Sequence, residues 1–110
     1  MKVLVTGGAG FVGTNLIKRL LKDGHEIVSV DNYSTGKKEN QQDGCVYHDI
    51  DISKTSLLYM DWMKPDIIYH MAARARIQPS IDNPHRTFES NTIGTENILE
   101  YARNENIPVV

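Results

Sequence analysis

The sequence has 110 residues and contains one cysteine, Cys45, one tryptophan and two phenylalanines. A single cysteine excludes a disulfide within the chain and favours a reducing compartment. No apolar run approaches the ~20 residues that a membrane-spanning helix needs, so we expect no membrane partner. Basic residues are dispersed and the net charge is −2, which argues against a nucleic-acid partner. An apolar run begins directly after Met1, where a signal peptide would stand, so we expect a cytoplasmic protein.

Apolar segments of two kinds alternate along the chain. Short β-branched runs predict strands over 2–6, 26–30, 45–49 and 66–71, with a further strand beginning at 107. Helical spacing of apolar residues predicts helices over 11–23, 53–63 and 84–104. Gly24 is expected to end the first helix, Ser53 to cap the second, and Asn83-Pro84 to begin the third. The alternation predicts an α/β fold, in which helices cover both faces of a parallel sheet. The expected strand order is 3-2-1-4, with the start of a fifth strand beside strand 4.

The first thirteen residues, MKVLVTGGAGFVG, are the most informative part of the chain. A β-branched run leads into Gly7, Gly10 and Gly13, and an apolar helical segment follows directly. A strand, a glycine-rich turn and a helix in this order place backbone N–H groups and a helix N-terminus against a pyrophosphate. The glycines provide a tight turn, close approach of the backbone to phosphate, and close helix–strand contact.

A carboxylate stands at the matching distance from these glycines. Asp31 follows the second predicted strand, about 20 residues past the glycines, where the group that binds an adenosine ribose is expected. A carboxylate there accepts hydrogen bonds from ribose hydroxyls and repels a 2′-phosphate, so we expect NAD to bind better than NADP. The alternative for Asp31 is a solvated carboxylate at the end of a strand.

Glycines spaced as G-x-x-G-x-x-G in TGGAGFVG resemble the extended short-chain dehydrogenase/reductase family, in particular nucleotide-sugar epimerases and dehydratases such as UDP-sugar 4-epimerases. Further segments resemble that family in the same order: the adenosine loop 31–36 (DNYSTG), the adenine pair Asp49-Ile50, the strand exit 70–73 (HMAA) and the helix motif 91–97 (NTIGTEN). The resemblance therefore covers nearly the whole chain. It implies a Rossmann-like domain with NAD as cofactor.

The resemblance also assigns residues to the cofactor site. The residues that match the family's NAD-binding positions are Gly7, Gly10, Phe11, Val12, Gly13, Asp31, Asn32, Ser34, Thr35, Gly36, Asp49, Ile50, Met71, Ala72, Ala73 and Asn91. Arg76 is a candidate for the diphosphate of a nucleotide-sugar substrate, and a solvated loop arginine is the alternative. For Asn91 the alternative is a polar surface position. The family further implies a homo-oligomer that pairs through the 84–104 helix.

Catalysis in this family uses a Tyr-x-x-x-Lys pair on a helix after strand 5. We therefore expect residues 1–110 to form a partial NAD-binding domain, without catalytic residues and without the sugar-binding lobe. The sequence does contain Tyr33 and Lys37 at this spacing, but a loop with Ser, Thr and Gly between them does not place two side chains on one helix face. We interpret this match as chance.

Three functions remain open at this point. The chain is the NAD-binding part of a nucleotide-sugar epimerase or dehydratase, a non-catalytic module that binds NAD or a partner, or one half of a split enzyme. His70 ends a strand and is expected to bond to backbone, with a general base as the alternative. His25, His48, His85 and Cys45 show no metal-ligand spacing, so no metal is expected.

Overall fold

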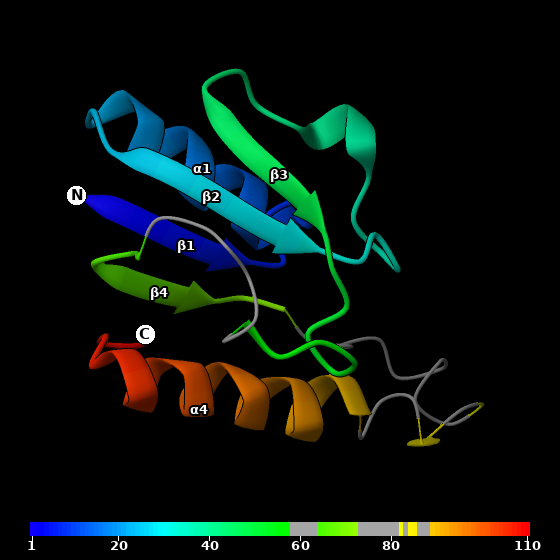
Figure 1. Cartoon of the computed structure of the whole chain (residues 1–110). Helices are drawn as coiled ribbons and strands as arrows, with labels where there is room; N and C mark the ends of the chain where they lie inside the picture. Colours follow the sequence, from blue (N-terminus) through cyan, green and yellow to red (C-terminus); the bar gives the residue numbers. More distant parts are fainter. Residues whose placement is uncertain (58–63, 73–81, 83, 86–88) are drawn as a thin grey trace.

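Four parallel strands form the sheet of the computed structural model, which describes residues 1–57, 64–72, 82, 84–85 and 89–110 (Figure 1). The order β3-β2-β1-β4 confirms the predicted α/β fold and strand order. The strands are β1 (Lys2–Thr6), β2 (Glu26–Asp31), β3 (Cys45–Asp49) and β4 (Ile67–His70). Val109 forms a parallel bridge beside β4, where the fifth strand was expected.

Helix α1 (Phe11–Lys22) connects β1 to β2 and ends where the sequence predicts. Gly24 adopts a φ of +86°, a left-handed conformation that favours glycine. The N–H groups of Gly24 and His25 donate to the carbonyls of Leu21 and Leu20, and so satisfy the last turn of the helix. This end directs the chain back into β2.

The sheet buries apolar side chains on both faces, because successive residues of a strand point to opposite sides. One face packs against α1, and the other packs against α4 (Gly94–Glu105), as Figure 1 shows. The α1-side core contains Val3, Val5, Ile17, Leu20 and Ile27. The α4-side core contains Leu4, Val30, Ile52, Leu57, Ile68, Ile98, Tyr101, Ala102 and Ile107. A fully buried aliphatic side chain contributes about 1.5–3 kcal/mol, so these two clusters hold the layers together.

The segment after β3 differs from the prediction. Asp51, not Ser53, begins the turn: its carbonyl accepts the N–H groups of Lys54 and Thr55, and its carboxylate accepts both the N–H and the hydroxyl of Ser53. The predicted Ser53 cap is therefore wrong, because the Ser53 side chain is already bonded to its neighbour. Leu57 is buried, and the rest of the helix predicted over 53–63 falls on 58–63, outside the described residues.

The last helical region is not one regular helix. Residues 82, 84 and 85 are helical, Glu89–Ile93 form a π-helical turn, and α4 begins only at Gly94. The Thr95 hydroxyl donates to the Asn91 carbonyl, 2.8 Å away, at the junction of the two segments. A side chain that bonds to the preceding turn in this way competes with regular helical hydrogen bonding. The prediction of a single α-helix over 84–104 is therefore wrong at 89–93.

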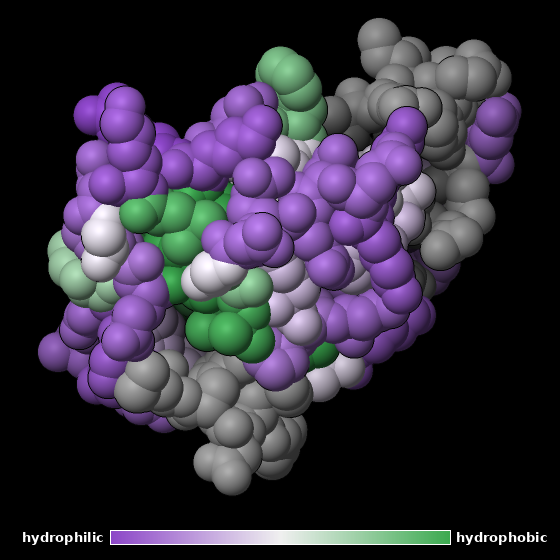
Figure 2. Space-filling view, turned by 90° about the horizontal axis from the view of Figure 1, so that it is seen from above, coloured by the Kyte–Doolittle hydropathy of each residue, from purple (hydrophilic) through white to green (hydrophobic). Residues whose placement is uncertain are grey.

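On the face shown in Figure 2, the described residues are mostly hydrophilic. Seen from above, apolar side chains gather in a patch that has hydrophilic residues on more than one side (Figure 2). Within the described ranges, no helix combines the length and the apolar character needed to cross a membrane.

Candidate functional site

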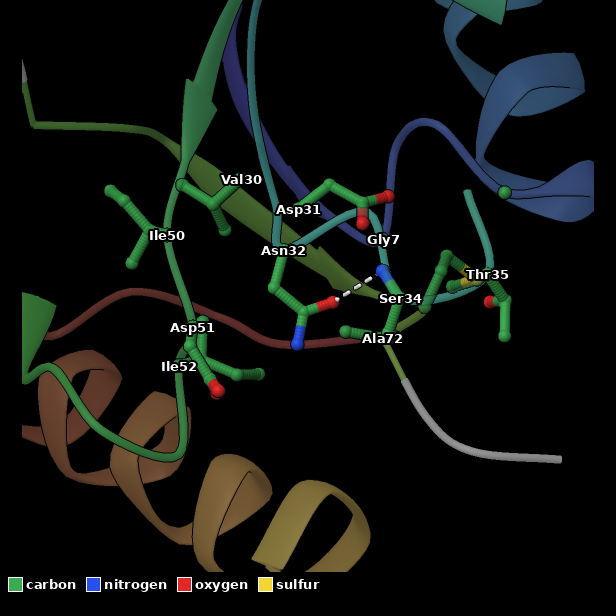
Figure 3. A pocket seen from close by; sticks show the side chains of 12 residues that line it. Gly7, Val30, Asp31, Asn32, Ser34, Thr35, Ile50, Asp51, Ile52 and Ala72 are labelled. Atoms are coloured by element: carbon green, nitrogen blue, oxygen red, sulfur yellow. Dashed lines mark hydrogen bonds between the residues drawn. The ribbon is translucent and has the colours of Figure 1, made fainter. Parts of the chain in front are cut away.

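A pocket opens at the carboxyl ends of the strands, where ligands bind in open parallel sheets (Figure 3). Its volume is about 560 Å³ when the open space at the mouth is included. It is lined by Gly7, Gly10, Val30, Asp31, Asn32, Ser34, Thr35, Ile50, Asp51, Ile52, Met71 and Ala72. In the view of Figure 3, Val30 and Ile50 lie on one side of the pocket, and Ser34, Thr35 and Ala72 lie on the other.

The three glycines of the turn differ in what surrounds them. A Cβ on Gly13 would lie 2.2 Å from the Gly7 carbonyl oxygen, so the fold itself excludes a side chain there. Gly7 has a φ of +72°, and a Cβ on it would lie 2.8 Å from the Ala72 nitrogen. A Cβ on Gly10 would meet only the Gly7 oxygen, at 3.4 Å, an ordinary contact. Since Gly10 lines the pocket, its missing side chain leaves space for a ligand.

The start of α1 presents unpaired donors beside this space. Among the described residues, the N–H groups of Phe11, Val12 and Gly13 have no hydrogen-bond partner. Gly10, the N-cap, has no side chain to cap the helix, and the first turn has no acidic residue. Among the described residues, no acidic side chain of the first turn compensates the partial positive charge of the helix N-terminus, which favours an anion such as a phosphate.

Asp31 connects the glycine-rich turn to the loop that follows β2. Its side chain is 9% exposed, and its two carboxylate oxygens accept the N–H groups of Ala9, at 2.9 Å, and Tyr33, at 2.7 Å. A Cβ on Gly36 would lie 2.9 Å from the same carboxylate. Each carboxylate oxygen keeps a further lone pair that can accept a hydrogen bond from a hydroxyl group. The buried negative charge suits neutral hydroxyl donors and repels a second anion.

The opposite wall is apolar with a polar edge. Val30, Ile50 and Ile52 provide the apolar surface, and Asp51 lies between the two isoleucines. Partial burial acts to raise the pKa of Asp51, but hydrogen bonds from Ser53 and Asn32 outweigh this effect and hold the pKa below its ordinary value. The Ser34 N–H donates to the Asn32 side-chain oxygen at 3.0 Å, the dashed line in Figure 3. A flat, mostly apolar ring with polar edges matches this wall.

Several of the predicted cofactor residues do not line the pocket. Phe11 and Val12 are exposed at the start of α1, and Phe11 is 84% exposed. Asp49 is exposed at the end of β3, opposite Asp31 in the strand register. Asn91 is exposed on the π-helical turn. Ala73 and the candidate substrate residue Arg76 lie outside the described residues.

Sequence reasoning missed Val30, Asp51 and Ile52. The strand alternation gave a signal for the last two, since HDIDI places Ile50 and Ile52 two residues apart on one side of an extended chain. The repeat of Asp-Ile in this segment made Asp51-Ile52 an alternative to Asp49-Ile50. Val30 could have been found as the inward-facing neighbour of Asp31.

The side chains considered for chemistry have other roles. Tyr33 adopts a left-handed conformation with a φ of 58°, and Lys38, not Lys37, lies over its ring, 5.6 Å from the centroid. Lys37 pairs with Glu39 instead. Tyr33 and Lys37 therefore form no helix-face pair, as their place in a loop predicts.

The hydrogen bonds of His70 differ from the expected bonding to backbone. The His70 ring bonds to the side chains of Thr6 and Thr95 rather than to backbone. Cys45 is only partly buried. Burial raises the pKa of its thiol to about 11, and a hydrogen bond with the Tyr47 side chain lowers this pKa by a smaller amount. The thiol therefore stays protonated near pH 7. In the part of the chain that is described, no three His, Cys, Asp or Glu side chains cluster closely enough to hold a metal ion.

Comparison with known proteins agrees with this geometry. The profile of the NAD dependent epimerase/dehydratase family matches residues 3–110. UDP-glucuronic acid decarboxylase 1 of Danio rerio is 38% identical over 102 residues, which are 93% of this chain and 24% of that protein.

Two solved structures are similar in fold. The UDP-glucose 4-epimerase of Thermus thermophilus in complex with NAD has a TM-score of 0.88 and 36% identity, over 97% of this chain and 35% of that one. The UDP-glucose 4-epimerase of Thermotoga maritima with UDP-glucose has a TM-score of 0.90 and 31% identity, over 97% and 35%. The chain thus spans between a quarter and about a third of the length of these relatives.

Proposed function

Because this chain belongs to the NAD dependent epimerase/dehydratase family, we propose that residues 1–110 are the NAD-binding part of an enzyme that acts on a nucleotide sugar. The predicted resemblance and the Rossmann-like fold are confirmed, and NAD is the cofactor of the family. The observation that carries the proposal is the space at Gly10 beside three unpaired N–H groups of α1, with Asp31 lining the same pocket.

When bound, NAD would accept a hydride from the sugar and return it. The chain's own residues bind and orient the dinucleotide. The N–H groups at the start of α1 hold the pyrophosphate, because they are unpaired and lie at the positive end of the helix. Asp31 accepts the ribose hydroxyls through its remaining lone pairs and disfavours the 2′-phosphate of NADP.

The two ends of the pocket suit the two bases of the dinucleotide. Val30, Ile50 and Ile52 offer an apolar surface to adenine, and Asp51 lies within the same wall. Met71 and Ala72 directly follow β4 and line the pocket, and we infer that they lie on the nicotinamide side. Among the described residues no Tyr–Lys pair shares a helix face, so we assign no proton-transfer step to them.

The wider assignments rest on family membership. The other partner of the complete enzyme is a nucleotide sugar, since the Thermotoga maritima structure contains UDP-glucose. A second copy of the chain pairs through the 84–104 region, where Leu99 of α4 is 52% exposed. The enzyme is cytoplasmic, and its chemistry is that of an isomerase. Sedimentation of the chain at several concentrations tests the pairing, and a monomer at every concentration would contradict it.

The NAD site is tested with Gly10→Ala. The added methyl projects into the pocket and meets no backbone closer than 3.4 Å, so the fold tolerates it while the pyrophosphate loses space. Calorimetric titration should show NAD binding weakened by at least about tenfold, or about 1.4 kcal/mol.

The matched control is Lys18→Ala, an alanine on the exposed side of α1 and outside the pocket. It should bind NAD as the wild type does. Thermal unfolding of both variants verifies that they are folded. A wild-type chain that binds no NAD, or a folded Gly10→Ala variant with unchanged affinity, would contradict the proposal.

A further inference from the structure

Side chains from three elements form a continuous hydrogen-bonded relay beside the pocket. Thr6 lies at the end of β1, His70 at the end of β4, and Thr95 in the first turn of α4. The Thr6 hydroxyl oxygen is 2.7 Å from Nδ1 of His70, and the Thr95 hydroxyl oxygen is 2.8 Å from Nε2. Both nitrogens of the imidazole are therefore engaged by neutral hydroxyl groups.

The direction of each hydrogen bond follows from the two ends of the relay. The Thr95 hydroxyl donates its hydrogen to the Asn91 carbonyl, which can only accept. Toward His70 it can therefore only accept, so Nε2 of His70 carries the hydrogen. In a neutral imidazole Nδ1 is then the acceptor, and it receives the hydrogen of the Thr6 hydroxyl.

At its other end the relay reaches the pocket wall. The Ala72 N–H donates to the Thr6 hydroxyl oxygen at 3.1 Å, and Ala72 lines the pocket. The Gly7 turn packs directly against Ala72, since a Cβ on Gly7 would lie 2.8 Å from the Ala72 nitrogen. Ala72 therefore cannot move toward that turn. The N–H of Ala72 and the carbonyl of Asn91 are thus the fixed ends of one chain of four hydrogen bonds.

The surroundings keep the imidazole neutral. Thr6 is fully buried and His70 is partly buried. Burial lowers the pKa of His70, because a charged ring loses hydration there. A doubly protonated ring would present a second N–H to Thr6 and displace the hydrogen that Thr6 now donates.

We propose that His70, as its Nε2–H tautomer, is a positioning residue that fixes the Ala72 wall of the pocket relative to the Asn91 turn. The proposal rests on the proposed function, since its effect is on NAD binding. His70 acts through Thr6 and Thr95, and both of its nitrogens are occupied, so it is not assigned a catalytic role.

The first test does not depend on any ligand. Nitrogen NMR of the wild-type imidazole near pH 7 should find the hydrogen on Nε2 and none on Nδ1. A ring with the hydrogen on Nδ1, or one that is doubly protonated at this pH, overturns the proposal whether or not NAD binds.

The second test breaks the relay at Thr95. Thr95→Val removes the hydroxyl at nearly constant shape, and Thr95→Ser keeps the hydroxyl. Thr92→Val makes the same change at an exposed residue of the π-helical turn, outside the relay. Thr95→Val should shift the Ala72 amide resonance and weaken NAD binding by at least about fivefold, the lower end of typical coupling between sites.

Thr95→Ser should restore both values, and Thr92→Val should leave both unchanged. A folded Thr95→Val protein with the wild-type Ala72 resonance overturns the proposal. If the wild type binds no NAD, the proposed function fails, and the tautomer together with the Ala72 resonance still decides the role of His70.

Discussion

Two walls of the pocket, the glycine-rich turn with Asp31 and the wall at Ala72, are built in different ways. The wall at Gly7–Gly13 and Asp31 is made of backbone and one buried carboxylate, and backbone atoms leave no room for a Cβ at Gly7 or Gly13. The wall at Ala72 is held from behind by hydroxyl groups and an imidazole that come from distant parts of the chain.

This difference determines how each wall fails. The glycine wall is sensitive to added volume, because backbone atoms cannot move aside as a side chain can. The Ala72 wall is sensitive to a lost hydrogen bond, because the partner that remains is at least partly buried and is left without its hydrogen bond. Substitutions that add a methyl group should therefore act on the first wall, and isosteric loss of a hydroxyl should act on the second.

The largest effect is expected for Gly13→Ala. The new methyl would lie 2.2 Å from the Gly7 oxygen and 2.8 Å from the Gly8 Cα, both backbone atoms. Overpacking of this kind should lower the free energy of unfolding by about 3 kcal/mol or more. Urea denaturation measures the loss, and Gly10→Ala, with less than about 1 kcal/mol lost, is the matched control. Equal losses in the two variants would remove the distinction between fold and pocket glycines.

Asp31→Ala should act on both stability and cofactor choice. Its two bonds to the Ala9 and Tyr33 N–H groups disappear, which should lower the free energy of unfolding by roughly 1–3 kcal/mol. The preference for NAD over NADP should narrow, since the charge that repels the 2′-phosphate is gone. Calorimetry with both nucleotides tests this, and tighter binding of NADP by the wild type would refute the assignment.

The Ala72 wall should weaken in acid. The pKa of His70 is lowered from 6.5 by burial in the folded state, so the unfolded state binds the proton more readily. The contribution of His70 to the free energy of unfolding is therefore complete above pH 6.5. It is lost as the pH falls toward the pKa of His70 in the folded state, by at most about 1.4 kcal/mol per pH unit. Urea denaturation across this pH range gives the free energy of unfolding as a function of pH. Its slope against pH should be smaller for His70→Asn than for the wild type. Identical slopes would exclude His70 as the source.

The smallest effect on stability is expected for Phe11→Ser. Phe11 is 84% exposed at the start of α1, so removing its ring should change the free energy of unfolding by less than about 0.5 kcal/mol. Thermal unfolding measures this. A loss comparable to that of Gly13→Ala would mean that the ring packs against the protein.

The glycine wall could be predicted from the sequence because its signals are local. The first 31 residues contain a strand, three spaced glycines, a helix and Asp31. Each of these features can be recognised from its own short stretch of sequence. The first helix and its end at Gly24 follow from the same kind of local rule. Hence the structure brings Gly7, Gly10 and Asp31 into one pocket, as the sequence indicates.

The other wall could not be predicted in this way. Thr6 and His70 are 64 residues apart, and His70 and Thr95 are 25 apart, so no local pattern joins them. The π-helical turn at 89–93 and the turn begun by Asp51 depend on side-chain hydrogen bonds that compete with regular helix geometry. Propensity alone favours the uninterrupted helices over 53–63 and 84–104.

The central claim is that NAD binds at the glycine-rich turn. Its most direct test is to follow backbone amide resonances of the wild-type chain while NAD is added. The account predicts saturable shifts in Gly10–Gly13, in Asn32–Thr35 and at Ala72, with little change at the exposed Val46 of β3. No saturable shift, or shifts centred on β3 away from the turn, would contradict it.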